Sequence, residues 1–447
     1  MSEPRADPPG HLMQLCREVP HPRGVVAAAL SVQAAFLWCY YHPGPRQLMG
    51  DELRYHAEAL AIARGQVLEP NFVWPPLQSQ LLGATFHLFG DSLVPIQLLQ
   101  ILSLWGGGLL LFAIARRIGL SPAASALCLL AFVCHPELVA FSHYLWPEVS
   151  HLALLLLATY AIADGRRRFL FAAGVALGVA LLLKSLLLPF TALFVLAAAW
   201  PRASTAWRPA AALVLVGMAV PVAPVVASNG LQHGYWAIAS SAAFNTWVGL
   251  NERSPRNLVD AIVAEEMDAY LSSSPDAGER DRRTWLRVRK KLAEEGPLRV
   301  AGSQLPRQLQ RLFDKDSFFT DQLPGGISAR YAGPGETATR LLRAFAYGMH
   351  WLLLCAAVMG MWAPTGTHLR QRIRPFFAFL IGNLLLFAVL HVKTRYRLQF
   401  LPVLLIYAAL FWDHVAKNLE APRWGGLRVL GAASTLVLVL WLGFAPK

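Results

Sequence analysis

Charged residues are scarce in this chain of 447 residues: Asp, Glu, Lys and Arg together make up 15% of it, against 55% hydrophobic residues. Ordinary soluble domains carry about 25% charged residues, so the composition excludes a soluble globular protein and indicates an integral membrane protein. Cysteine is also scarce. The five cysteines form no Cys-x-x-Cys pair, and the long polar stretch 229–340 has none. This pattern argues against a disulfide framework and against a structural zinc site.

Internal repeats, low-complexity segments and a Rossmann-type nucleotide-binding pattern are missing from the sequence as well. Basic residues are in excess, with a net charge of +13 at pH 7. A nucleic-acid-binding protein gathers such charge in one patch or stripe. Here much of the excess lies in short loops between apolar runs, at 116–117, 166–168, 202–208, 370–374 and 417–428. These loops alternate along the chain as the positive-inside rule requires, which argues against nucleic acid as the partner.

Long apolar runs dominate the sequence. A helix that crosses a bilayer needs about 20 mostly apolar residues, and eleven candidate runs lie at 25–41, 93–115, 119–134, 149–163, 169–183, 185–200, 209–228, 341–362, 375–391, 398–413 and 429–444. They predict an all-α polytopic membrane protein with about 11 transmembrane helices. The basic loops then place the N-terminus in the cytoplasm and the odd-numbered connections outside.

These spans divide the chain into four parts. Residues 1–24 form a cytoplasmic tail, too long for an ordinary signal n-region, and we expect the first span to be a retained anchor. Residues 25–228 form an N-terminal transmembrane module of about seven helices, with a first outer loop at 42–92. Residues 229–340 form a mostly helical extracytoplasmic insert, and residues 341–447 form a C-terminal transmembrane module of about four helices.

Short helices are predicted outside the spans, at 51–64, 73–90, 254–272, 279–295 and 298–318. We expect Asp51 to cap the first of them and Gly65 to end it. The helix within 73–90 follows two prolines and is too short to span, so it suits the membrane interface.

Adjacent carboxylates, Asp51 and Glu52, open the first outer helix in the sequence GDELRY. One interpretation is a helix cap beside a hydrated surface acid. The other is a general base, its pKa raised by partial desolvation near the membrane so that it takes a proton from a hydroxyl group. Two acids also offer hard oxygen ligands for a divalent cation, Mg²⁺ or Mn²⁺. Tyr55, one helical turn on, is within reach of Asp51.

A third acid, Glu148, opens the fourth span on the same predicted side, in YLWPEVSHL. An acid at a helix N-terminus is often simple compensation of the helix dipole, and Glu137 in the same loop is a rival for any functional role. If Glu148 has a function, it acts on the same outer face as Asp51.

Basic residues on that outer face run against the topology rule and therefore need an explanation. Lys184 stands alone between two apolar runs, and the short turn HVKTRYR at 391–397 contains Lys393, Arg395 and Arg397. These groups either snorkel to lipid headgroups or bind phosphate, which guanidinium groups hold through paired hydrogen bonds. On this predicted outer face, carboxylates that can activate a hydroxyl group occur together with Lys and Arg side chains that can hold a phosphate. This combination suits transfer of a group from a phosphate leaving group that is embedded in lipid.

The three motifs resemble a known family. GDELRYHAEALAIARG followed by FVWPPLQSQLLGATFHLFGDS, then HPELVAFSHYLWPEV and HVKTRYRLQF, are similar to the outer loops of GT-C membrane glycosyltransferases. The nearest branches are glycosyltransferase family 39, the protein O-mannosyltransferases, and the lipid A aminoarabinose transferases. The matching positions are Asp51, Glu52, Tyr55, Ala59, Gly65, Pro75, Pro76, Leu77, Phe89 and Gly90. The insert 229–340 departs from the family, because it is helical where protein mannosyltransferases carry a β-rich module.

The resemblance implies an inverting glycosyltransferase that moves a sugar from a polyprenyl-phosphate carrier to a hydroxyl of an extracytoplasmic lipid, glycan or protein. Asp51 would be the base, with Glu52 and Glu148 supporting the acceptor or a cation. The implied substrate-binding residues are Tyr55, Lys184, His391, Lys393, Arg395, Tyr396 and Arg397. A flippase or transporter of lipid-linked sugars, or a surface-polysaccharide ligase or polymerase, stays open as an alternative. The composition and the absence of retention signals point to a bacterial inner membrane.

Overall fold

All regular secondary structure in the described part of the chain is helical. The computed structural model describes residues 18–66, 72–199, 207–251, 261–387, 390–417 and 426–443, and none of these ranges contains a β-strand. The predicted all-α class is therefore confirmed, and the protein is an integral membrane protein.

Each of the eleven apolar runs is occupied by a helix. These helices are α2 (Pro22–Tyr41), α5 (Val94–Ile118), α6 (Pro122–Val133), α8 (Glu148–Asp164), α9 (Arg167–Leu183), α10 (Thr191–Ala199), α11 (Trp207–His233), α16 (Glu336–Trp362), α17 (Thr367–Phe387), α18 (Leu401–Lys417) and α19 (Gly426–Gly443). Among the described residues, five segments are long and apolar enough to cross a bilayer: α2, α5, α11, α16 and Thr394–Lys417, which ends with α18. The number of eleven crossings stays a prediction.

Glycines bring the backbones of α9 and α11 into direct contact. A Cβ atom added to Gly174 would lie 2.1 Å from the carbonyl oxygen of Val214, and one added to Gly217 would lie 2.3 Å from that of Phe171. Small residues at such crossings let helices approach closely, which is a main source of packing between helices in lipid. Lys184 thus follows a helix, α9, that is packed directly against α11.

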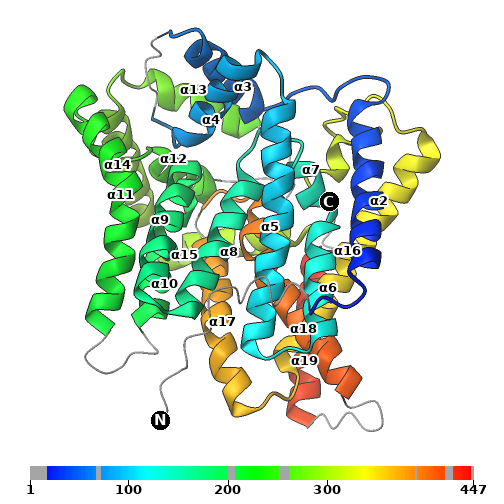
Figure 1. The fold of residues 1–447 in the computed structure, drawn as a ribbon. Helices are drawn as coiled ribbons and strands as arrows, with labels where there is room; N and C mark the ends of the chain where they lie inside the picture. The colour runs from blue at the N-terminus through cyan, green and yellow to red at the C-terminus, as the bar shows by residue number, and fades with distance from the viewer. Residues whose placement is uncertain are drawn as a thin grey trace.

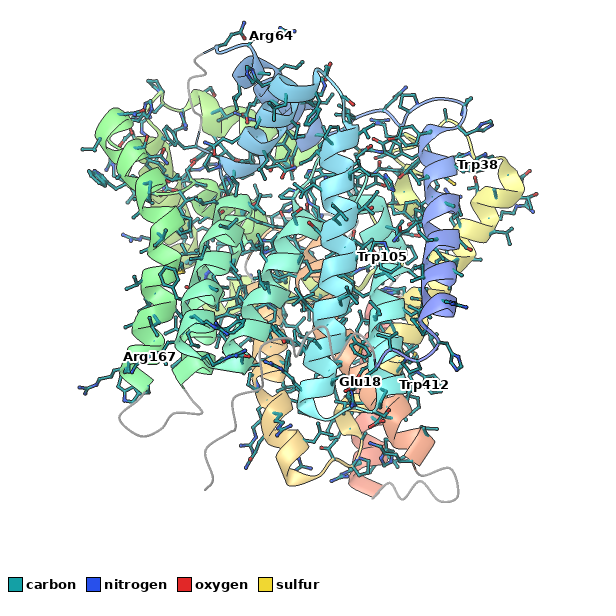
Figure 2. All side chains as sticks on the ribbon, in the orientation of Figure 1. Glu18, Trp38, Arg64, Trp105, Arg167 and Trp412 are labelled. Atoms are coloured by element: carbon teal, nitrogen blue, oxygen red, sulfur yellow. The ribbon has the colours of Figure 1, made fainter. Side chains whose placement is uncertain are left out.

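The two ends of the helix bundle carry different segments of the chain. Helix α3 (Asp51–Ala63) packs against α4 (Leu77–Phe89), and the two lie at one end of the bundle, the top of Figure 1, near α13 (Ala261–Ser272). Arg64, which follows α3, is at this end, whereas Arg167, the first residue of α9 in the basic segment 166–168, is at the opposite end (Figure 2). The outer loop and that basic segment therefore lie at opposite ends, as the sequence predicts.

The short helices are confirmed with small changes at their ends. The insert contains α13, α14 (Ala277–Glu295) and α15 (Pro297–Phe313), and residues 254–260 of the predicted first helix lie outside the described residues. Helix α12 (Ser241–Asn251) was not predicted. The expectation that Asp51 caps α3 is wrong: the N-cap is Gly50, and the Asp51 side chain has other partners. Gly65 has φ +67°, which suits the residue that ends a helix.

Candidate active site

Four charged side chains from four distant segments meet at the outer-loop end of the bundle. Arg395, in the 3₁₀ turn η4 (Thr394–Phe400), donates from Nη2 to Oδ2 of Asp51 at 2.8 Å. Its Nε lies 3.7 Å from Oε1 of Glu148, and Lys184 Nζ donates to that same oxygen at 3.1 Å. We call these four residues, Asp51, Glu148, Lys184 and Arg395, the charged cluster.

Interruptions of the helices place these side chains. Asp51 and Glu148 are the first residues of α3 and α8, where the positive end of the helix dipole favours a carboxylate. Lys184 has an extended backbone between α9 and the 3₁₀ turn η1 (Ser185–Phe190), so its side chain does not follow the helical direction of the α9 side chains before it. Polar side chains can therefore gather where α8, α9 and η4 approach one another, although the flanking segments are apolar.

Asp51 is held as an anion. Burial raises the pKa of its carboxyl group, but the positive charges of Arg395 and Lys393, with hydrogen bonds from Arg395 and Trp146, outweigh burial and leave the pKa below its usual value. The indole Nε1 of Trp146 donates to Oδ2 at 3.2 Å, and the side chain remains 28% exposed. The expectation of a raised pKa is wrong for this arrangement, because the guanidinium partner lies closer than the sequence alone indicates.

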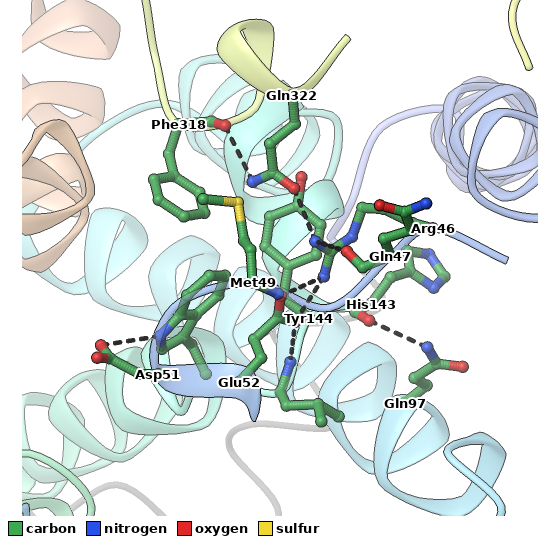
Figure 3. Close-up of polar contacts among 12 residues, drawn as sticks. Arg46, Gln47, Met49, Asp51, Glu52, Gln97, His143, Tyr144, Phe318 and Gln322 are labelled. Atoms are coloured by element: carbon green, nitrogen blue, oxygen red, sulfur yellow. Dashed lines mark hydrogen bonds and ion pairs between the residues drawn. The ribbon is translucent and has the colours of Figure 1, made fainter. Parts of the chain in front are cut away.

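Glu52 faces different partners, although it is adjacent in sequence. Its side chain is 0% exposed, and Arg46 Nη2 donates to both carboxylate oxygens at 2.5 and 2.7 Å (Figure 3). The backbone N–H of Leu145 donates to Oε1 at 3.0 Å. The Arg46 guanidinium lies 4.1 Å from the ring centroid of Tyr144 and donates to Gln322 at 2.7 Å. Glu52 therefore lies outside the charged cluster and ties the start of α3 to two other loops.

Two aromatic residues implied by the resemblance flank the charged cluster. Lys184 Nζ lies 4.8 Å from the ring centroid of Tyr396, whose ring stacks on Phe387. Tyr55 is buried one turn along α3, where burial, and then the charge of Asp51, raise the pKa of its hydroxyl group. The described contacts contain no hydrogen bond from Tyr55 to Asp51.

Two other residues of the 391–397 turn have partners elsewhere. Arg397 is buried, forms an ion pair with Glu137 of α7 (Pro136–Phe141) and donates to the carbonyl oxygen of Asp314 at 2.6 Å. His391 is buried, and its backbone N–H donates to the carbonyl oxygen of Asn245 at 2.9 Å. These contacts attach the turn to α7 and to the insert, and they direct Arg397 away from Asp51.

The carboxylates of Asp51 and Glu52 do not form a joint cation site. Each is paired with its own arginine, Arg395 or Arg46. In the part of the chain that the structure describes, no group of three or more His, Cys, Asp or Glu side chains is arranged to hold a metal ion. The donor set present at Asp51 and Glu52 does not fit a shared Mg²⁺ or Mn²⁺.

Three glutamines that the sequence interpretation missed hold the loop before Glu148. The side-chain amides of Gln97, Gln100 and Gln78 donate to the carbonyl oxygens of residues 143, 144 and 145, at 3.0, 2.7 and 2.7 Å. All three glutamines are buried. Their signal in the sequence was an amide inside an apolar helix, where an unpaired polar group is costly. Arg46 was missed too, and its signal was a positive charge in a predicted outer loop.

An apolar pocket lies between α8, α10, α17 and the η4–α18 segment, with a cavity volume of about 100 Å³. Its lining is almost entirely hydrophobic and consists of Leu152, Leu155, Leu156, Thr159, Ile162, Leu193, Phe194, Ala197, Pro375, Phe376, Phe379, Gln399, Pro402 and Val403. The lining begins one helical turn after Glu148 on α8 and four residues after Arg395 in η4. The pocket therefore runs into the bundle next to the charged cluster.

Comparison with protein families supports the predicted resemblance. Residues 73–227 match the family described as dolichyl-phosphate-mannose-protein mannosyltransferase. This segment contains Pro75, Pro76 and Leu77 of the first motif, together with Glu148 and Lys184. A search of the curated proteins gives no match to this chain.

Two solved structures of ArnT from Cupriavidus metallidurans are similar to the chain. The structure bound to undecaprenyl phosphate has 18% sequence identity and a TM-score of 0.41, with 92% of this chain and 77% of that chain covered. The structure in the apo state has 19% identity and a TM-score of 0.36, with 86% and 76% covered.

Proposed function

We propose that the protein is an inverting glycosyltransferase that moves a sugar from a polyprenyl-phosphate carrier to a hydroxyl group of an extracytoplasmic acceptor. The family match over residues 73–227 supports the reaction class. The observation that supports it most directly is the contact of Asp51 with Arg395, because it joins a general-base candidate to a phosphate-binding candidate from segments 344 residues apart. Two such groups in direct contact suit the cleavage of a sugar–phosphate bond.

The apolar pocket suits the polyprenyl chain. A hydrocarbon tail needs an apolar channel, and the phosphate that it carries needs cations at one end of that channel. Here the lining between α8, α10 and α17 is hydrophobic, and it begins beside Glu148 and Arg395. A carrier in this pocket would present its phosphate to Arg395 and Lys184 and its sugar to Asp51.

Proton and charge movements follow from this placement. Asp51 accepts the proton of the acceptor hydroxyl while that oxygen attacks the anomeric carbon, and the bond from this carbon to the phosphate oxygen breaks. Attack from the side opposite the leaving group inverts the configuration. The released polyprenyl phosphate gains one negative charge, which Arg395, Lys184 and Lys393 stabilise. This sequence of steps uses no metal ion.

Donor binding changes the partners of Arg395. Without donor, Arg395 is hydrogen-bonded to Asp51, which keeps this carboxylate a weak base. A phosphate that takes these hydrogen bonds leaves Asp51 partly desolvated with less positive charge nearby, and its pKa then rises. The base therefore becomes stronger when the donor is in place.

The remaining residues of the site have supporting roles in this proposal. Glu148 holds Lys184 and Arg395 next to each other, and Tyr55 and Tyr396 form walls of the sugar site. Glu52 positions α3 through Arg46, and Arg397 and His391 position the 391–397 turn.

The substitution Asp51→Asn tests the base. We expect sugar transfer to fall about 10²–10⁴-fold, with donor binding retained, as measured by transfer from a polyprenyl-phosphate sugar and by equilibrium binding of the donor. The matched control is Glu58→Gln, an acid on the same helix with the same 28% exposure, which pairs with Arg54. Full transfer activity in Asp51→Asn would refute the assignment of the base.

A further inference from the structure

Gln399 is an amide inside an apolar pocket. Its side chain is 5% exposed and lines the pocket, together with residues such as Leu152, Phe379 and Val403. Within the described residues, neither its Nε2 nor its Oε1 has a hydrogen-bond partner. Buried amides are nearly always hydrogen-bonded, because an unpaired amide loses its bonds to water without replacement. This amide therefore indicates a polar ligand group in the pocket.

The position of Gln399 identifies the end of the pocket at which this polar group lies. It follows Arg395 by four residues in the same 3₁₀ turn, a rise of about 8 Å at about 2 Å per residue. Leu152, on the facing wall, is one turn below Glu148. Oε2 of Glu148 also has no hydrogen-bond partner among the described residues. Gln399 thus belongs to the outer end of the pocket, just inside the charged cluster.

We propose that Gln399 is a further substrate-binding residue, whose amide Nε2 donates a hydrogen bond to a phosphate oxygen of the lipid-linked donor from the membrane side. This inference rests on the proposed function. A polyprenyl chain has no hydrogen-bond acceptor of its own, so the phosphate is the polar group that such a ligand places at this end of the pocket. Arg395 then holds the phosphate from the outer side and Gln399 from the inner side.

The test compares Gln399→Leu, which keeps a side chain of similar size without polar atoms, with the control Thr246→Val. Thr246 lies in α12 and does not line the pocket, and its hydroxyl donates to the carbonyl oxygen of Ala242. Binding of a polyprenyl phosphate to the full-length protein in detergent is measured by titration. The corresponding polyprenol and inorganic phosphate serve as separate probes of the tail and of the phosphate.

We expect Gln399→Leu to weaken polyprenyl phosphate binding about tenfold or more, with polyprenol binding unchanged and Thr246→Val like the wild type. Without ligand, Gln399→Leu should unfold at the same or a higher temperature, because it removes an unpaired buried amide; a merely structural role predicts a lower one. Equal affinity of Gln399→Leu and the wild type for polyprenyl phosphate would overturn the inference alone. A wild-type protein that binds no polyprenyl phosphate, or binds inorganic phosphate or polyprenol equally well, would overturn the proposed function too.

Discussion

Arg395 determines how strong a base Asp51 is. The Nη2 of Arg395 and the indole of Trp146 both donate to Oδ2 of Asp51, and the charge of Lys393 adds to their effect. Burial alone would raise the pKa of Asp51, so its low pKa depends on the positive charges of Arg395 and Lys393. The ionisation of Asp51 should therefore respond to the loss of its partner.

Substitution Arg395→Ala should shift the acidic limb of the pH–activity profile to higher pH. Transfer requires ionised Asp51, so in the wild type activity persists to a pH below the ordinary carboxyl pKa of about 4. Without the guanidinium group, burial dominates and the pKa of Asp51 rises. The profile of kcat/KM against pH measures the shift on the residual activity. The control Arg54→Ala removes a cation from α3, the helix of Asp51, that is paired with Glu58, and it should leave the acidic limb of the profile in place. An acidic limb that does not move in Arg395→Ala would contradict this account.

At the scale of elements, the start of α3 is fixed by contacts that are separate from the chemistry. The ion pair of Arg46 with Glu52 connects α3 to the loop at residue 145 and to Gln322 (Figure 3). The three glutamines hold the carbonyl groups of residues 143–145. Both sets of contacts position Trp146, which in turn contacts Asp51. The site is thus built on a loop that several buried hydrogen bonds hold in place.

Glu52→Gln should therefore destabilise the protein much more than Asp51→Asn does. Neutralising Glu52 leaves Arg46 buried without its counter-charge, a loss of about 3–5 kcal/mol for a buried pair. Asp51 is partly exposed, and its pair with Arg395 stabilises the fold less. Thermal unfolding of the purified variants in the same detergent compares the two directly. Equal unfolding temperatures for the two variants would show that Glu52 is not a structural anchor.

The sequence was sufficient to predict α3, α4 and the helices of the apolar runs, because local periodicity and turn residues such as Gly65 determine them. The sequence could not predict which arginine pairs with which carboxylate. Whether Asp51 or Glu52 faces Arg395 depends on the rotation of α3 about its axis, which the distant contacts of Glu52 determine. Arg395 and Arg397 stand two residues apart with similar sequence surroundings, yet one contacts Asp51 and the other Glu137.

For the whole molecule, the proposed function requires that α3 and the charged cluster face the extracytoplasmic side. The bundle separates Arg64 from Arg167, and both side chains are exposed (Figure 2). The alternation of the basic loops predicts that Arg167 lies on the cytoplasmic side. A sugar acceptor outside the cell and a base inside it could not meet, so this orientation is a condition of the mechanism.

Cysteine labelling tests the orientation. In a variant without native cysteines, Arg64→Cys should react with a membrane-impermeant thiol reagent in intact cells, or in spheroplasts if an outer membrane blocks access. Arg167→Cys should react only after the membrane is permeabilised. Retained transfer activity shows that each labelled variant is folded, and equal labelling of both after permeabilisation controls for exposure. The reverse pattern would place Asp51 on the cytoplasmic side of the membrane and would exclude an extracytoplasmic acceptor, whatever the local geometry of Asp51 and Arg395.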